Sequence, residues 1–132
     1  MVRRAYEAFN RGDRETMIAD LDPSFEYVPT GVLPDTVSVA RGPEGYVEFA
    51  GWLWDQFDDV RVELNELMDA DDKVVAAVTL RGRGRQSGVE TSWHLWHVWT
   101  FRQAKVVHGR AFTDRAEALE AARLSEQGGG RP

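Results

Sequence analysis

The sequence predicts a single α+β domain in which a curved antiparallel sheet wraps around helices from the N-terminal part of the chain. The chain has 132 residues, of which 42% are hydrophobic, and a chain of this length buries enough surface for one real core. Apolar residues recur at helical spacing in much of the first half, whereas from residue 60 they alternate with polar ones or form continuous runs. This change of period predicts helices followed by strands, the order typical of α+β folds.

Two short helices are predicted at the start of the chain. Between Val2 and Phe9, apolar side chains fall at i, i+3, i+4 and i+7, which places them on one stripe of a helix that ends in a turn at 10–12. Asp13 is expected to cap a second helix. This helix must end before Pro23, because the residue before a proline is disfavoured in the helical conformation.

A short strand and a third helix follow. The strand is predicted at 25–28, and the loop after it contains several prolines and glycines and is long enough to form a lid. Pro43 suits the first turn of a helix, and apolar residues then recur at helical spacing as far as Phe57.

The second half of the chain predicts an antiparallel sheet and a last helix. Four strands are expected, at 60–68, 74–80, 90–102 and 105–112. Asp114 and Glu117 stand three residues apart, which matches a capping box that opens a terminal helix. We therefore expect one domain at 1–124 and a flexible C-terminal tail at 125–132.

Composition and spacing argue against several classes of partner and cofactor. With 16 basic and 22 acidic residues the net charge is −6, so the chain lacks the electrostatic footprint of a nucleic-acid binder. It has no cysteine and no run of about 18 apolar residues that could span a membrane. The histidines do not cluster, and no phosphate-binding or dinucleotide-binding motif is present. We expect a soluble, cytoplasmic protein with no nucleic-acid or membrane partner, no metal and no cofactor.

Six motifs occur in an order that is similar to a known superfamily. They are RAYEAFNRGD (4–13), DPSFEY (22–27), RGPE (41–44), RGRGRQSG (81–88), HVWTF (97–101) and DRAEAL (114–119). They resemble the nuclear-transport-factor-2-like superfamily, especially its SnoaL-like and ketosteroid-isomerase-like branch, over essentially the whole chain. The resemblance implies a cone-shaped, cystatin-like roll. It does not select an activity, because this superfamily includes isomerases, cyclases, dehydratases, epoxide hydrolases and non-catalytic binders.

The resemblance also implies where the catalytic groups of characterised branches would fall. The general base of ketosteroid isomerases falls on Val28, and the tyrosine of their oxyanion hole falls one residue before Tyr6. The catalytic acids of limonene epoxide hydrolases fall within 73–75 and on Ala111. These positions do not carry the required groups, so neither chemistry is expected. The protonated aspartate of the isomerase oxyanion hole falls on His97, which can donate or accept a proton near neutral pH.

The strand at 90–102 is the predicted chemical centre. Because side chains alternate along a strand, Trp93, His97 and Trp99 share one face, and the resemblance turns this face toward the helices. Indole rings around one titratable group are typical of a small-molecule pocket, and a small residue such as Ala111 on the last strand would leave room for a ligand. The opposite face carries Trp96, and we expect a homodimer to cover it.

We predict one catalytic residue, His97, and eight ligand-binding residues. The ligand-binding set is Tyr6, Glu26, Val28, Trp54, Arg81, Trp93, Trp99 and Ala111. Simpler alternatives stand beside these roles: His97 as a hydrogen-bonded core histidine, the charged residues as solvated surface groups, and the aromatic residues as ordinary core.

The leading functional hypothesis is a pocket protein, similar to SnoaL-like cyclases and isomerases, that binds a small hydrophobic molecule. If this molecule carries a carbonyl group, His97 is expected to shift a proton on it. The alternatives are a non-catalytic small-ligand binding protein and a dimeric protein-interaction module. The absence of the carboxylates used by characterised relatives favours a non-catalytic protein.

Overall fold

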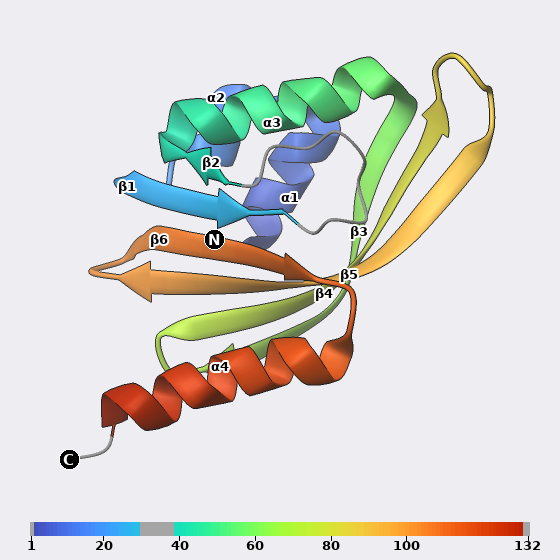
Figure 1. The fold of residues 1–132 in the computed structure, drawn as a ribbon. Coiled ribbons are helices and arrows are strands. Elements are labelled where there is room, and N and C mark those ends of the chain that lie inside the picture. The colour runs from blue at the N-terminus through green and yellow to red at the C-terminus, as the bar shows by residue number, and fades with distance from the viewer. Residues whose placement is uncertain (1, 30–38, 131–132) are drawn as a thin grey trace.

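The computed structural model describes residues 2–29 and 39–130 and shows a curved six-stranded sheet with helices on both faces (Figure 1). The elements are α1 (Val2–Arg11), α2 (Arg14–Ile18), β1 (Leu21–Val28), β2 (Ala40–Arg41), α3 (Gly42–Gln56), β3 (Phe57–Ala70), β4 (Lys73–Gly84), β5 (Glu90–Arg102), β6 (Lys105–Phe112) and α4 (Arg115–Gly130). This order agrees with the sequence prediction except for the short strand β2. The centre of the predicted lid loop, at 30–38, lies outside the described residues.

Helix α1 ends in the predicted turn, whereas α2 ends at Ile18, earlier than the stop predicted before Pro23, and β1 begins at Leu21 rather than at residue 25. Gly12 adopts a positive φ of 71° and its N–H bonds to the Phe9 carbonyl at 3.1 Å, which ends α1. The Asp13 side chain accepts a hydrogen bond from the Thr16 N–H at 3.2 Å and caps α2. Asn10, near the end of α1, bonds through its side-chain amide to both the N–H and the carbonyl of Val62 in β3. These contacts fix α1 against the edge strand of the sheet.

The strands form a sheet in the order β2-β1-β6-β5-β4-β3. All neighbouring strands are antiparallel except β1 and β6, which are parallel. The turn between β5 and β6 places Gln103 and Ala104 at φ values of 52° and 66°, as in the two-residue hairpin turns that match the twist of a sheet. β1 therefore extends the C-terminal sheet and brings the start of the chain beside its end.

The main core lies between the concave face of the sheet and α1, α2 and α3. Its side chains come from both layers, for example Phe9 of α1, Phe49 of α3 and Val78 of β4, and each of these is buried. Burial of such apolar side chains is the main favourable contribution to folding. The predicted sheet wrapped around N-terminal helices is thus confirmed.

A second, smaller core lies between the outer face of the sheet and α4. Ala118 and Ala122 stand one helical turn apart and are buried against Val75 and Val98, and their small size lets α4 approach the sheet closely. Trp96, which we expected a partner subunit to cover, packs in this cluster. The outer face therefore gives no argument for the homodimer at this position, and the homodimer stays a prediction.

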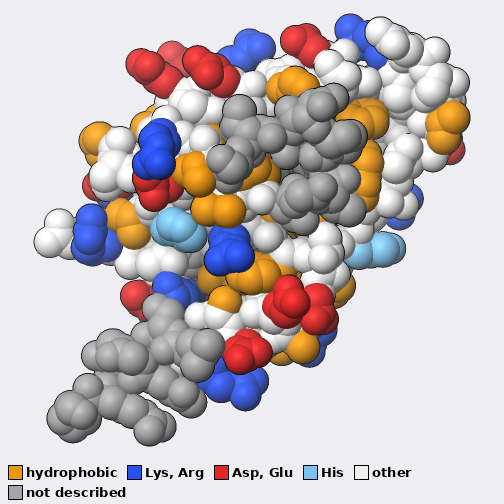
Figure 2. All heavy atoms as spheres, in the orientation of Figure 1, with side chains coloured by type: hydrophobic (Ala, Val, Ile, Leu, Met, Phe, Trp, Pro, Cys, Tyr) orange, Lys and Arg blue, Asp and Glu red, His pale blue; other side chains and the backbone are white. Residues whose placement is uncertain are grey.

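Helix α4 extends into the segment predicted as a tail, because it runs to Gly130. The domain boundary at residue 124 stays a prediction. Within the described part of the chain, no helix is long and apolar enough to cross a membrane. Figure 2 shows acidic and basic side chains interspersed on the visible face.

Candidate functional site

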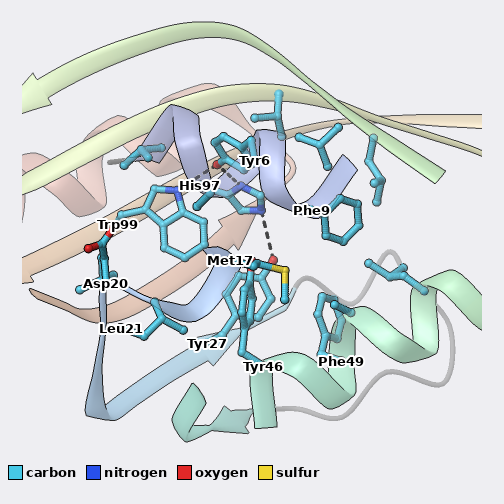
Figure 3. A pocket seen from close by; sticks show the side chains of 18 residues that line it. Tyr6, Phe9, Met17, Asp20, Leu21, Tyr27, Tyr46, Phe49, His97 and Trp99 are labelled. Atoms are coloured by element: carbon cyan, nitrogen blue, oxygen red, sulfur yellow. Dashed lines mark hydrogen bonds between the residues drawn. The ribbon is translucent and has the colours of Figure 1, made fainter. Parts of the chain in front are cut away.

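A cavity of about 70 Å³ opens between the concave face of the sheet and the N-terminal helices (Figure 3). Its described lining is mostly apolar and aromatic: Val2, Ala5, Tyr6, Phe9, Met17, Asp20, Leu21, Tyr27, Tyr46, Phe49, Ala50, Leu53, Val62, Val78, Leu80, His97, Trp99 and Val106. A water needs roughly 10–15 Å³ of such space, so the cavity admits several waters or a small organic group. Apolar walls with a few convergent polar groups are typical of small-molecule sites.

His97 lies in the wall of this cavity, with a tyrosine hydroxyl on each ring nitrogen. The Oη of Tyr6 is 2.6 Å from Nδ1, and the Oη of Tyr27 is 3.1 Å from Nε2. The indole N–H of Trp99 donates to the Oη of Tyr6 at 2.9 Å. Figure 3 shows these rings gathered around the imidazole, which is 6% exposed. Helix α1 and two strands thus supply one connected polar cluster inside an apolar wall.

Local sequence explains why these side chains meet. His97 and Trp99 are two residues apart on β5 and point to the same face, and Tyr27 points inward from β1, where it is buried. On the neighbouring strand β6, Gly109 leaves space for the Trp99 ring. A Cβ at Gly109 would lie 2.3 Å from that ring, closer than any normal contact. The glycine is therefore required for the position of Trp99.

Burial makes the cluster electrically neutral. It lowers the pKa of His97 to about 4, because removal from water disfavours the charged imidazolium. It raises the pKa values of Tyr6 and Tyr27 well above their ordinary value. At neutral pH the site therefore contains an uncharged imidazole and two uncharged phenols.

The charged group of the described lining is Asp20, next to the start of β1. Its carboxylate pairs with the exposed Arg4 guanidinium at 2.5 Å, and its backbone carbonyl accepts the N–H of Val106 at 2.9 Å. In Figure 3 the Trp99 ring stands between Asp20 and the hydroxyl groups bonded to His97.

The structure brings three of the predicted site residues together, namely His97, Tyr6 and Trp99. Ala111 is buried and lies directly opposite His97 on β6, but it does not line the cavity. Two predicted tryptophans are on the inner side but do not line the cavity. Trp93 packs on Phe57 at the far end of β5, and Trp54 packs behind Phe9, which does line it.

Three predicted site residues lie on the outer face of the sheet and are not part of the described cavity lining. Tyr27 points into the cavity, so its neighbours on β1, Glu26 and Val28, point the other way. Glu26 pairs there with Arg41. Arg81 pairs with Glu63 and borders a separate polar groove.

The predicted set of ligand-binding residues omits Tyr27 and Tyr46, which line the cavity; Tyr27 was considered as a hydrogen-bond donor, but core packing explained it equally well. A signal for Tyr27 was available, because Phe25 and Tyr27 are the aromatic residues of β1 and alternate with the polar residues Ser24 and Glu26. Among the described residues, no group of three or more metal-ligating side chains is present.

A curved sheet that holds helices on its concave face around an apolar cavity defines the nuclear-transport-factor-2-like class of folds. Residues 2–109 match the SnoaL-like domain family. The chain belongs to this family. Among curated proteins, none matches the chain by sequence.

Solved structures agree with this assignment. A nuclear-transport-factor-2-like protein from Burkholderia thailandensis is 29% identical, with a TM-score of 0.78 over 89% of this chain and 93% of that one. A putative SnoaL-like polyketide cyclase from Jannaschia is 20% identical, with a TM-score of 0.73 over 92% and 88% of the two chains. TerC, co-crystallized with polyporic acid, is 20% identical, with a TM-score of 0.75 over 92% and 95%. At this level of identity, the last two show a shared fold.

Proposed function

We propose that the cavity binds a small, uncharged, hydrophobic molecule with a carbonyl group, and that the protein shifts a proton on this molecule. The observation that carries the proposal is a buried imidazole in the wall of an apolar cavity, with a phenol on each of its nitrogens. Apolar walls bind the body of a ligand, and a small polar cluster orients it. The similarity to a putative polyketide cyclase supports a carbonyl-bearing ligand.

Neutral phenols suit a reaction that places negative charge on oxygen. When a proton leaves the carbon next to a carbonyl, charge develops on the carbonyl oxygen, and fixed hydrogen-bond donors in a dry site stabilise it. Tyr27 is buried and uncharged near neutral pH, so its hydroxyl can act as such a donor. His97 exchanges protons with the ligand through a tyrosine hydroxyl, because both of its ring nitrogens already bond to tyrosines.

A non-catalytic binding protein is the second candidate, and one observation favours it. Burial holds the pKa of His97 at about 4, so the imidazole is a weak base at neutral pH. A protein that only binds its ligand would use the same cavity and the same hydrogen bonds without proton transfer.

Two measurements separate the candidates. Uncharged aromatic ketones are first tested for a rise in melting temperature, since a ligand of the native state stabilises it by mass action. Ketones that bind are then incubated with the protein in deuterated water, and NMR follows exchange of the protons beside the carbonyl. Catalysis predicts faster exchange than in buffer, and His97→Gln should remove the acceleration. His94→Gln is the matched control, because His94 lies on the same strand but is exposed on the outer face and bonds to Thr79.

Stabilisation with accelerated exchange supports the enzyme, whereas stabilisation without exchange supports the binding protein. If no ketone stabilises the protein, the cavity is not a site for this class of molecule and the proposal fails.

A further inference from the structure

Four side chains form one line of hydrogen bonds along the cavity wall, in the order Trp99, Tyr6, His97 and Tyr27. The three separations are 2.9 Å from Trp99 Nε1 to Tyr6 Oη, 2.6 Å from Tyr6 Oη to His97 Nδ1, and 3.1 Å from His97 Nε2 to Tyr27 Oη. All four residues line or adjoin the same apolar space, and each is less than 10% exposed. The position of every proton in this line follows from its first member.

Trp99 determines which atoms donate and which accept along the line of hydrogen bonds. An indole N–H can only donate, so the Oη of Tyr6 must accept from it. A phenol oxygen offers two favourable directions in the plane of its ring, one for its hydrogen and one for a lone pair. Since Trp99 uses the lone pair, the hydrogen of Tyr6 points to Nδ1 of His97, and this nitrogen carries no proton.

The tautomer of His97 in turn makes the Tyr27 oxygen a hydrogen-bond acceptor. A neutral imidazole has one N–H, so the ring carries its proton on Nε2 and donates it to the Oη of Tyr27. The lengths of the two bonds agree with this order. The 2.6 Å bond to Tyr6 is shorter than the usual N–H···O range of about 2.7–3.2 Å and suits an O–H donor. The 3.1 Å bond to Tyr27 suits an N–H donor.

The order leaves the hydroxyl hydrogen of Tyr27 free for a ligand. Tyr6 uses its lone pair on Trp99 and its hydrogen on His97, and both nitrogens of His97 are occupied. Tyr27 lines the cavity, is 4% exposed and has His97 as its hydrogen-bond partner among the described residues. A buried O–H without an acceptor is costly, so a ligand oxygen that accepts it gains affinity.

The charges of the cavity define which oxygen fits. Its described lining contains no lysine or arginine, and its charged member is the carboxylate of Asp20. An anionic ligand would lose its hydration in this space without meeting a cation, which is unfavourable. A neutral acceptor loses much less when it leaves water.

We propose that the Tyr27 hydroxyl is the polar contact of the ligand and donates its hydrogen to an uncharged oxygen acceptor such as a ketone. The hydrogen bonds from Trp99 to Tyr6, from Tyr6 to His97 and from His97 to Tyr27 leave this hydrogen directed at the ligand. The ligand part rests on the proposed function, whereas the order of protons does not depend on it. Tyr27 is thus a specificity-determining residue, and Tyr6 is a positioning residue that acts through His97.

The first test asks which ring nitrogen of His97 carries the proton, in the protein without ligand. In protein labelled with ¹⁵N-histidine at pH 7, nitrogen shifts distinguish protonated from unprotonated ring nitrogens. The expected result for His97 is a protonated Nε2 and an unprotonated Nδ1. Tyr6→Phe removes the donor to Nδ1 and should shift His97 toward the other tautomer, which a merely structural role of Tyr6 would not do. A protonated Nδ1 in the unmodified protein overturns the proposal.

The ligand contact is tested with three probes of similar shape: acetophenone, its hydrocarbon analogue α-methylstyrene, and benzoate. Tyr27→Phe should weaken acetophenone binding about tenfold, as expected for one lost hydrogen bond, and change α-methylstyrene binding by less than about twofold. Tyr46→Phe removes another phenol hydroxyl of the same cavity that is outside the hydrogen-bond line, so its effect on acetophenone should be smaller. Benzoate should bind more weakly than acetophenone.

The outcomes separate this proposal from the proposed function. An equal loss for acetophenone and α-methylstyrene in Tyr27→Phe would show that the residue acts through shape, and benzoate binding as tight as acetophenone would refute the preference for neutral ligands. Binding of none of the probes would contradict the proposed function, while the tautomer of His97 would still decide the order of protons.

Discussion

Mild acid should destabilise this protein through His97. Burial lowers the pKa of this histidine from 6.5 to about 4 in the folded protein, whereas in the unfolded chain the imidazole is in water and keeps its ordinary value. Between these two values the unfolded state binds a proton that the folded state does not, so the free energy of unfolding falls as the pH falls. The stabilising contribution is complete above pH 6.5 and is lost progressively toward pH 4.

The size of this effect follows from the difference between the two pKa values, which corresponds to about 3 kcal/mol when fully expressed. Urea unfolding of the unmodified protein, His97→Gln and His94→Gln at pH 7, 6, 5 and 4.5 measures it. Other groups also contribute to the pH dependence of stability, including His108, whose pKa is also lowered by burial. The informative quantity is therefore the difference in slope between His97→Gln and the unmodified protein.

His97→Gln should be less stable at pH 7 and should lose less stability on acidification, whereas the exposed-site variant His94→Gln should follow the unmodified protein. If His97→Gln and the unmodified protein lose stability in parallel between pH 7 and pH 4.5, His97 is not a buried neutral imidazole and the electrostatic description of the site is wrong.

Three further predictions concern stability and are measured by urea unfolding at pH 7. Gly109→Ala drives a Cβ into the indole ring of Trp99 and should lower the free energy of unfolding by about 1–3 kcal/mol. The control Gly51→Ala, at an open position of α3, should raise it by up to about 1 kcal/mol, and similar effects at both sites would contradict the packing described. Ala118→Asp buries a charge between α4 and the sheet and should lower the free energy of unfolding by about 3 kcal/mol or more. The control Ala116→Asp, at an exposed position of the same helix, should change it by less than about 0.5 kcal/mol, and equally small effects of both substitutions would mean that α4 does not pack on the sheet. Ala104→Gly relieves a positive φ in the β5–β6 turn and should stabilise by about 1 kcal/mol, so a loss of stability would argue against this turn geometry.

Much of the fold could be predicted from the sequence because its strongest signals are local. The helical stripe of α1, the capping residue Asp13 and the hairpin turn at 103–104 depend on neighbouring residues, and the structure confirms them. The parallel pairing of β1 with β6 was not predicted. It joins segments from opposite ends of the chain, and no local pattern encodes which strand lies beside which.

The outer face of the sheet illustrates the same limit. The prediction assigned the cover of Trp96 to a second subunit and did not consider the terminal helix. The structure shows that α4 packs on this face through Ala118 and Ala122. Alanines carry little hydrophobic signal, so their role in a close helix–sheet contact is not visible before the elements are placed.

The orientation of the site residues could be predicted on β5 but not on β1. Alternation along β5 correctly put His97 and Trp99 on the inner face, where they line the cavity. On β1, the position of the isomerase base in related proteins suggested the face of Glu26 and Val28, although burial alternates in favour of Tyr27. The hydrogen bonds on both sides of His97 join three separate elements and depend on side-chain conformations, which no sequence pattern specifies.

One titration tests most directly whether the cavity at His97 is the ligand site. The protein is labelled with ¹³C in its histidine rings, and acetophenone is added at pH 7 while the ring signals of the three histidines are followed by NMR. The ring signals of His97 should move and saturate with increasing ketone, while those of His94 and His108, which lie on the outer face, should stay in place. No movement of the His97 signals up to the solubility limit of the ketone, or equal movement of all three histidines, would contradict the assignment of this cavity as the functional site.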